Sequence, residues 1–109
     1  MAPVSLPFGG RSFTCVRLAE ANFKDLAAIY IILSVGEDRK YTVIDVGQSG
    51  ELGTRIDSHD RMDYWKRNCP TGNIWVCAYP MPTDTYSKDD RLKFEQALRH
   101  EYNPHCGDR

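Results

Sequence analysis

The chain has 109 residues, of which 41% are hydrophobic and 27% are charged, and its formal net charge is −1. This length fits one domain with a single modest core, and the composition is that of an ordinary globular protein. A protein that grips a nucleic-acid backbone by itself usually has an excess of basic residues, and this chain has none. A nucleic-acid partner would therefore be bound weakly or with the help of another subunit.

Neither a membrane span nor a secretory signal is visible. The apolar run Ala27–Leu33 is far shorter than the roughly 20 residues that a span needs, and residues 1–13 lack a basic region followed by an apolar core. We therefore expect a cytoplasmic protein without a membrane partner. In that compartment the four cysteines should be reduced thiols: Cys15, Cys69, Cys77 and Cys106. A zinc site is the weaker alternative, because the spacing fits no common finger among Cys69, Cys77, His105 and Cys106.

The first half of the chain predicts a β-hairpin after an irregular start. Residues 1–19 are expected to be an irregular lead-in, within which 12–18 form a short edge strand or an extended arm. One helical turn is expected over 20–25. The β-branched run Ala28–Leu33 predicts a fully buried strand, and Tyr41–Val46 returns after a polar turn as a second strand.

Helical spacing begins after the hairpin. Leu52–His59 predicts a helix, and His59–Lys66 predicts a second helix or a continuation of the first. Gly53 weakens the first helix by about 1 kcal/mol relative to alanine, which points to a close approach of backbone or ligand there. Asn73–Met81 predicts a third strand.

Residues 89–102 predict the last helix. Ser87 and Asp90 resemble a capping box with Asp in place of Glu, and Asn103-Pro104 ends the helix. The order strand, strand, helix, helix, strand, helix predicts one α/β (α+β) domain over residues 1–109. Its core, residues 26–107, is expected to be a three-stranded mixed or antiparallel sheet flanked by helices.

Four short motifs follow one another along this core. They are Ala28-Ile29-Tyr30, Asp45-Val46-Gly47, the helical segment Leu52–His59 with its Arg55, and Glu95-Gln96-Ala97-Leu98 with Tyr102 and Pro104. In order and spacing they resemble the motifs of the GIY-YIG domain, the fold of certain intron homing endonucleases and of repair incision subunits. The chain resembles a divergent member of that family.

The resemblance implies a metal-dependent nuclease that hydrolyses a phosphodiester in nucleic acid, in DNA rather than RNA. It implies a single Mg²⁺ or Mn²⁺ ion on Glu95 and places Tyr30 near the attacking water. A hard cation prefers carboxylate oxygen and keeps waters that a substrate phosphate displaces. Arg55 would offer paired donors to the phosphate, and His59 on the same helical face is a second group for proton transfer.

Further residues are expected on the substrate side. Gly47 is a candidate because a glycine allows special backbone geometry or a close approach of another group. Arg61 and Lys66 are candidates because of their positive charge. Tyr64-Trp65 beside them is a candidate patch for base stacking. Because acidic residues interleave with the basic ones, a partner protein or a second copy is expected to supply more basic surface.

Asp45 and Gly107 depart from the family pattern, which has a Tyr at the first position and often an Asn at the second. If Asp45 faces Tyr30 and Glu95, it is an added metal ligand or a base; if it faces a lysine or arginine, it is a buried partner. The departures leave open a catalytically impaired module that binds nucleic acid or protein. A third hypothesis is an enzyme acting on a small phosphate-bearing metabolite.

Each candidate also has a purely structural interpretation. Tyr30 would then be a packed aromatic residue, Arg55 a solvated helix charge and His59 a structural residue of its helix. Glu95 lies one helical turn from two arginines, so its alternative role is a surface ion pair worth about 0.5 kcal/mol.

Overall fold

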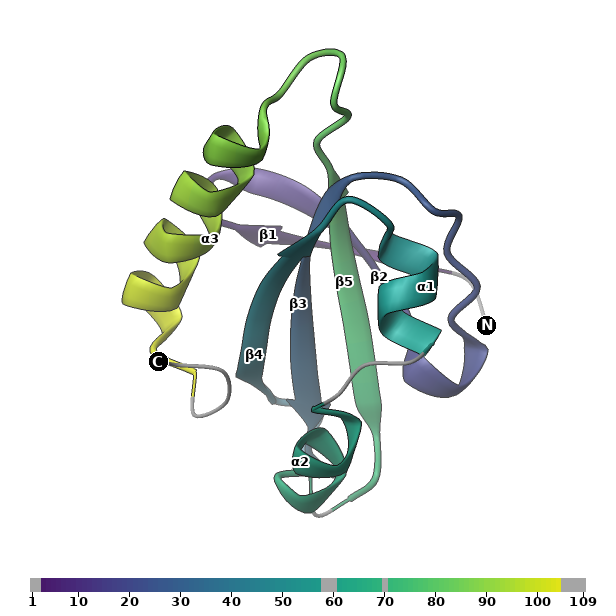
Figure 1. Ribbon diagram of the computed structural model, residues 1–109. Helices are drawn as coiled ribbons and strands as arrows, with labels where there is room; N and C mark the ends of the chain where they lie inside the picture. Colours follow the sequence, from purple (N-terminus) through teal and green to yellow (C-terminus); the bar gives the residue numbers. More distant parts are fainter. Residues whose placement is uncertain (1–2, 58–60, 70, 105–109) are drawn as a thin grey trace.

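A computed structural model of the chain describes residues 3–57, 61–69 and 71–104. Its centre is a five-stranded antiparallel sheet in the order β1-β2-β5-β3-β4 (Figure 1). The strands are β1 (Val4–Phe8), β2 (Arg11–Arg17), β3 (Ala28–Val35), β4 (Tyr41–Ser49) and β5 (Ile74–Pro80). The helices are the 3-10 turn η1 (Leu18–Glu20), α1 (Leu52–Asp57), α2 (Met62–Arg67) and α3 (Lys88–Tyr102). The α+β class is as predicted, but the sheet has two more strands than the three expected.

The additional strands come from the N-terminal region, where the prediction of an irregular lead-in is wrong. β1 and β2 form a hairpin, and β2 lies between β1 and β5 instead of at an edge. Gly9 and Gly10 both have positive φ, 57° and 77°, and make the tight turn between the strands. Pro7 is tolerated because β1 is an edge strand.

The helical turn expected over 20–25 is also wrong. The 3-10 turn η1 ends at Glu20, and residues 21–27 contain no helix. This connecting segment instead runs alongside the start of α1, where Leu52 N donates to the Leu26 carbonyl at 3.0 Å.

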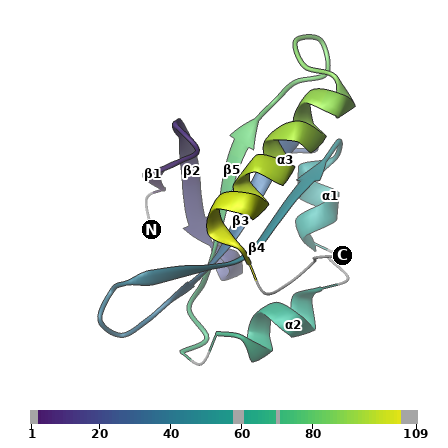
Figure 2. The ribbon, with the colours of Figure 1, turned by 90° about the vertical axis from the view of Figure 1, so that its left-hand side faces the viewer.

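The helices cover both faces of the sheet. α1 and α2 lie on one face and α3 lies across the other, as the two views show (Figures 1 and 2). β3 therefore has two buried faces: Tyr30 and Ile32 pack towards α1 and α2, whereas Ile29 and Ile31 pack towards α3. This burial explains its unbroken apolar run and confirms the predicted buried strand. No helix in the described part of the chain is long and apolar enough to cross a membrane.

The ends of α3 match the prediction. Ser87 Oγ accepts a hydrogen bond from Asp90 N at 3.1 Å, and Asp90 Oδ2 accepts one from Ser87 N at 2.9 Å, so the capping box is confirmed. At the other end Asn103 is left-handed, with φ 46°, and Pro104 follows it. These caps fix where the helix carrying Glu95 begins and ends.

The expectation of reduced thiols is wrong for one pair. Cys15 in β2 lies opposite Cys77 in β5, and a disulfide joins them, while Cys69 is free and buried. Cys77 is therefore not a zinc ligand, and His105 and Cys106 lie outside the described residues. Disulfides are rare in the cytoplasm, so this pair gives no support to the expected location.

Candidate functional site

Tyr30 and Gly47 lie opposite each other in the paired strands β3 and β4. A Cβ at Gly47 would overlap Cζ and Oη of Tyr30, so the phenol ring lies against the glycine backbone. Tyr30 is only 1% exposed. Gly47 is therefore needed here for close approach of an aromatic ring.

Arg55 in α1 donates a hydrogen bond to the phenol of Tyr30. Burial is the main cause that raises the pKa of Tyr30, and the negative charge of Asp45 raises it further. The positive charges of Arg55 and Arg61 act in the opposite direction. Since the net shift is upward, Tyr30 is a neutral phenol near pH 7.

The segment before β3 holds α1 in place. Asp25 accepts hydrogen bonds from the backbone N and the Oγ1 of Thr54, both at 2.6 Å. A Cβ at Gly53 would overlap the carbonyl oxygen of Phe23, so the close approach predicted at Gly53 is one of backbone. These contacts fix the helix that carries Arg55.

Asparagine in place of Asp25 is expected to loosen α1. The hydrogen bond from the Thr54 side chain, followed by the one from its backbone, lowers the pKa of Asp25. A lowered folded-state pKa contributes stability above the unfolded pKa, and this contribution is lost as the pH falls through the folded value. The urea midpoint of D25N should therefore lie below that of wild type at pH 7 and approach it at about pH 2. The exposed Asp84→Asn is the control; equal D25N losses at both pH values would contradict the assignment.

Asp45 is fully buried in β4 and is surrounded by N–H groups. Its Oδ1 accepts from Val46 N at 2.8 Å and from Arg99 Nη2 at 3.1 Å. Its Oδ2 accepts from Trp65 Nε1 at 2.8 Å and lies 3.2 Å from Arg61 Nε. The sequence left open whether Asp45 acts at the site or is a buried partner of basic residues. This geometry is that of a buried partner of two arginines.

A β-bulge in β4 sets the direction of the Asp45 side chain. Ile32 pairs with Asp45 but Leu33 pairs with Val43, so Ile44 is the extra residue of a bulge. A bulge bends its strand and redirects side chains. Because β4 is at the edge of the sheet, α2 and α3 can both reach Asp45 although they belong to different layers.

Glu95 in α3 lies beside this carboxylate. Its side chain is 17% exposed, and its Oε2 is 3.7 Å from Arg99 Nε. Burial is the main cause that raises the pKa of Glu95; Arg99 and Arg61 lower it, and Asp45 adds a smaller upward effect. Glu95 therefore lies within electrostatic range of Asp45 and Arg61.

The structure thus brings most predicted site residues together. We call this group the β4-edge cluster; its members are Tyr30, Asp45, Gly47, Arg55, Arg61, Trp65, Glu95 and Arg99. His59 and Gly107 lie outside the described residues. The stacking interpretation of Trp65 is wrong because this residue is fully buried, whereas Tyr64 is half-buried with the Arg67 guanidinium 5.8 Å from its ring centre.

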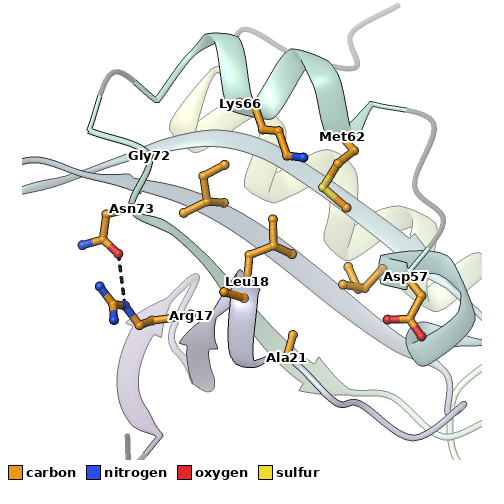
Figure 3. Close-up of a pocket in the computed structure, with 11 residues that line it drawn as sticks. Arg17, Leu18, Ala21, Asp57, Met62, Lys66, Gly72 and Asn73 are labelled. Atoms are coloured by element: carbon orange, nitrogen blue, oxygen red, sulfur yellow. Dashed lines mark hydrogen bonds between the residues drawn. The ribbon is translucent and has the colours of Figure 1, made fainter.

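Lys66 lies at a different place. It lines a cavity of about 840 Å³ between η1, α1, α2 and the start of β5. Figure 3 shows Lys66 and Met62 on one side and Arg17, hydrogen-bonded to Asn73, on the other. None of Tyr30, Asp45, Arg55 and Glu95 lines this cavity. Lys66 is therefore not placed to act with the β4-edge cluster.

Sequence reasoning missed the role of Arg99 and the polar role of Trp65. The helical spacing between Glu95 and Arg99 indicated only a surface ion pair. Nothing in the local sequence linked Arg99 or Trp65 to Asp45. Among the residues that the structure describes, no three or more His, Cys, Asp or Glu side chains are grouped to hold a metal. Within the β4-edge cluster, two arginines lie within 3.2 Å of the Asp45 carboxylate, whereas the contact of Glu95 with Arg99 is longer, at 3.7 Å.

Comparisons of the chain with protein-family models, with curated proteins and with solved structures found no match.

Proposed function

We propose that the domain is a metal-dependent phosphodiesterase of GIY-YIG type that acts on nucleic acid, DNA in preference to RNA. One observation carries the proposal: a buried phenol–guanidinium pair and a half-buried carboxylate, supplied by different elements, converge on Asp45 and Arg61. These groups suit hydrolysis of a phosphodiester, which needs charge stabilisation at the phosphate and positioning of water.

Arg55 would bind the phosphate. Its guanidinium is planar and permanently charged, and paired N–H donors match two phosphate oxygens. The hydrogen bond to Tyr30, which is itself packed against Gly47, holds Arg55 in one orientation. A cation that is already oriented stabilises developing negative charge without reorganisation during the reaction.

Tyr30 would act as a neutral phenol, and because it is 1% exposed, it would reach the attacking water through the hydroxyl end that meets Arg55. Because its pKa is raised, the phenolate is disfavoured, and a resting phenolate base does not fit this site. A neutral phenol can orient the water and relay a proton, accepting one while it passes on its own.

Glu95 would hold the divalent cation. A carboxylate oxygen is the ligand that Mg²⁺ and Mn²⁺ prefer, and such ions commonly use one or two carboxylates together with waters and substrate phosphate. The single carboxylate left at the β4-edge cluster fits that pattern. When bound, the cation would polarise a phosphoryl oxygen and lower the pKa of a coordinated water.

The direct test uses purified protein with end-labelled single- and double-stranded DNA and RNA, each with Mn²⁺, Mg²⁺ or EDTA. We expect DNA cleavage that requires the metal and disappears in Glu95→Gln protein that still folds. Absence of cleavage under all conditions, or cleavage by E95Q at the wild-type rate, would overturn the proposal.

A second function is favoured by the surroundings of Asp45. Two arginines and an indole engage the residue that stands where the family motif has a Tyr, so a hydroxyl is missing from this place. A catalytically impaired module that binds nucleic acid or protein would tolerate this change. It would retain a labelled oligonucleotide or a protein partner but would neither bind Mn²⁺ nor cleave.

A further inference from the structure

We infer that Asp45 is a positioning residue, which holds Arg61 and Arg99 and so keeps the carboxylate of Glu95 accessible to a cation. The functional part of this inference rests on the proposed role of Glu95. The structural part, the competition of two carboxylates for the same arginines, can be tested without metal or substrate.

The contacts of Asp45 are all with groups of the protein itself. A carboxylate offers about four acceptor positions, two on each oxygen. Three N–H groups donate to Asp45, those of Val46, Trp65 and Arg99, and Nε of Arg61 forms an ion pair with its Oδ2 at 3.2 Å. The residue is fully buried. A metal ligand or a general base must face the substrate, whereas Asp45 is fully buried and its oxygens face two arginines and an indole, so the geometry assigns Asp45 to the arginines.

Arg99 lies between two carboxylates and is closer to one of them. Its Nη2 is 3.1 Å from Asp45 Oδ1 and also donates to the carbonyl oxygen of Val46, whereas its Nε is 3.7 Å from Glu95 Oε2. β4 therefore holds the guanidinium through two contacts. The contact with Glu95, which lies on the same helix, is the longer one.

Charge balance shows what the removal of Asp45 would do. Asp45 lies within 3.2 Å of Arg61 and Arg99, and Glu95 lies 3.7 Å from Arg99. Without Asp45, two partly buried guanidinium groups would lose a contacting carboxylate, and an uncompensated buried charge is costly. The nearest remaining anion in the β4-edge cluster is Glu95, so the arginines are expected to turn towards it and obstruct it.

A double-mutant cycle tests this expectation. The coupling between Glu95 and Arg99 is measured by urea unfolding of E95Q, R99Q and the double variant, first with Asp45 present and then with Asp45→Asn. We expect the coupling to grow at least twofold in D45N. The matched control is Asp89–Lys93, an ion pair of the same spacing on the same helix at 3.2 Å, whose coupling should not change. An unchanged Glu95–Arg99 coupling overturns the inference.

D45N is expected to be the least stable of these proteins, so a charge-balanced background is included. D45N combined with Arg61→Gln removes one charge of each sign, so the net charge of the β4-edge cluster is the same as in wild type. The Glu95–Arg99 coupling should rise in this background as well. If it does not rise, Asp45 does not compete with Glu95 for Arg99.

Mn²⁺ binding connects the inference to function. D45N should lower the affinity for Mn²⁺ about tenfold, as loss of residues behind a metal ligand commonly does. D45N/R61Q/R99Q should recover most of that affinity, because neither arginine is then left to obstruct Glu95. If Asp45 were itself a ligand, the added arginine substitutions would recover nothing. A wild-type protein that binds no Mn²⁺ refutes the proposed metal site, while the metal-free cycle still decides the role of Asp45.

Discussion

Alanine in place of Arg55 is expected to lower kcat/KM for DNA cleavage about 100- to 1000-fold, the usual cost of losing one oriented donor at a developing charge. The structure supports a large effect because the guanidinium is anchored by the buried phenol of Tyr30. Single-turnover cleavage of a labelled duplex in Mn²⁺ would measure the loss in the chemical step. Lysine at this position should recover only part of the rate, since it keeps the charge but loses the paired donors.

The matched control for this prediction is Arg67→Ala. Arg67 is an exposed arginine of α2 whose contact is with the ring of Tyr64. The control should cleave within about twofold of wild type if bulk positive charge is unimportant, because exposed charges are screened by salt. Equal losses in both variants, with circular dichroism unchanged, would mean that Arg55 only adds to the general surface charge.

Alanine in place of Gly47 is expected to cost about 3 kcal/mol of unfolding free energy, at the upper end of typical overpacking penalties. The added Cβ would overlap Cζ and Oη of Tyr30, whose ring is enclosed by the core on the α1 side of the sheet. The ring would have to move, and Arg55 would lose its anchor. Urea unfolding measures the stability, and the cleavage assay should show a parallel loss of activity.

Two comparisons make the Gly47 prediction specific. Gly50→Ala is the control, since nothing lies within 4 Å of an added Cβ there, and it should change stability by less than about 0.5 kcal/mol. Tyr30→Ala removes the obstructing ring, so G47A/Y30A should be more stable than the sum of the two single effects implies. Simple additivity of G47A and Y30A would show that the ring is not the obstacle.

Local signals predicted much of the fold. β3 is apolar throughout because both of its faces are buried, and an unbroken run of this kind can be recognised without tertiary information. The capping box at Ser87 depends on atoms three residues apart, so it too was predictable from the sequence. For the same reason the hairpin β3–β4 and helix α3 agree with the predictions.

Non-local pairing was not predictable in the same way. The β1–β2 hairpin joins the sheet through β5, and the disulfide pairs Cys15 with a residue 62 positions later. A single sequence does not indicate which distant strands pair or in which register. The proline-containing start therefore suggested an irregular lead-in, although Pro7 sits acceptably on an edge strand.

The candidate site likewise has a part that local sequence predicted and a part that depends on contacts between distant segments. The sequence by itself was enough to select Tyr30, Gly47, Arg55 and Glu95 as site candidates, because their spacing along strands and helices is a local property. The tertiary structure alone decided that Lys66 lies apart from them at another cavity and that Arg99 joins them.

The orientation of Asp45 is the clearest case of what only the tertiary structure decides. The sequence left open whether this residue is a metal ligand or a base, or instead a buried partner of a lysine or arginine, since each role requires a carboxylate in a strand. The bulge at Ile44 and the helices on both sides of β4 turn its oxygens towards two arginines and an indole. A buried charge takes the partners that surround it, because desolvation makes an unpaired carboxylate too costly, and those partners come from segments far apart in the chain.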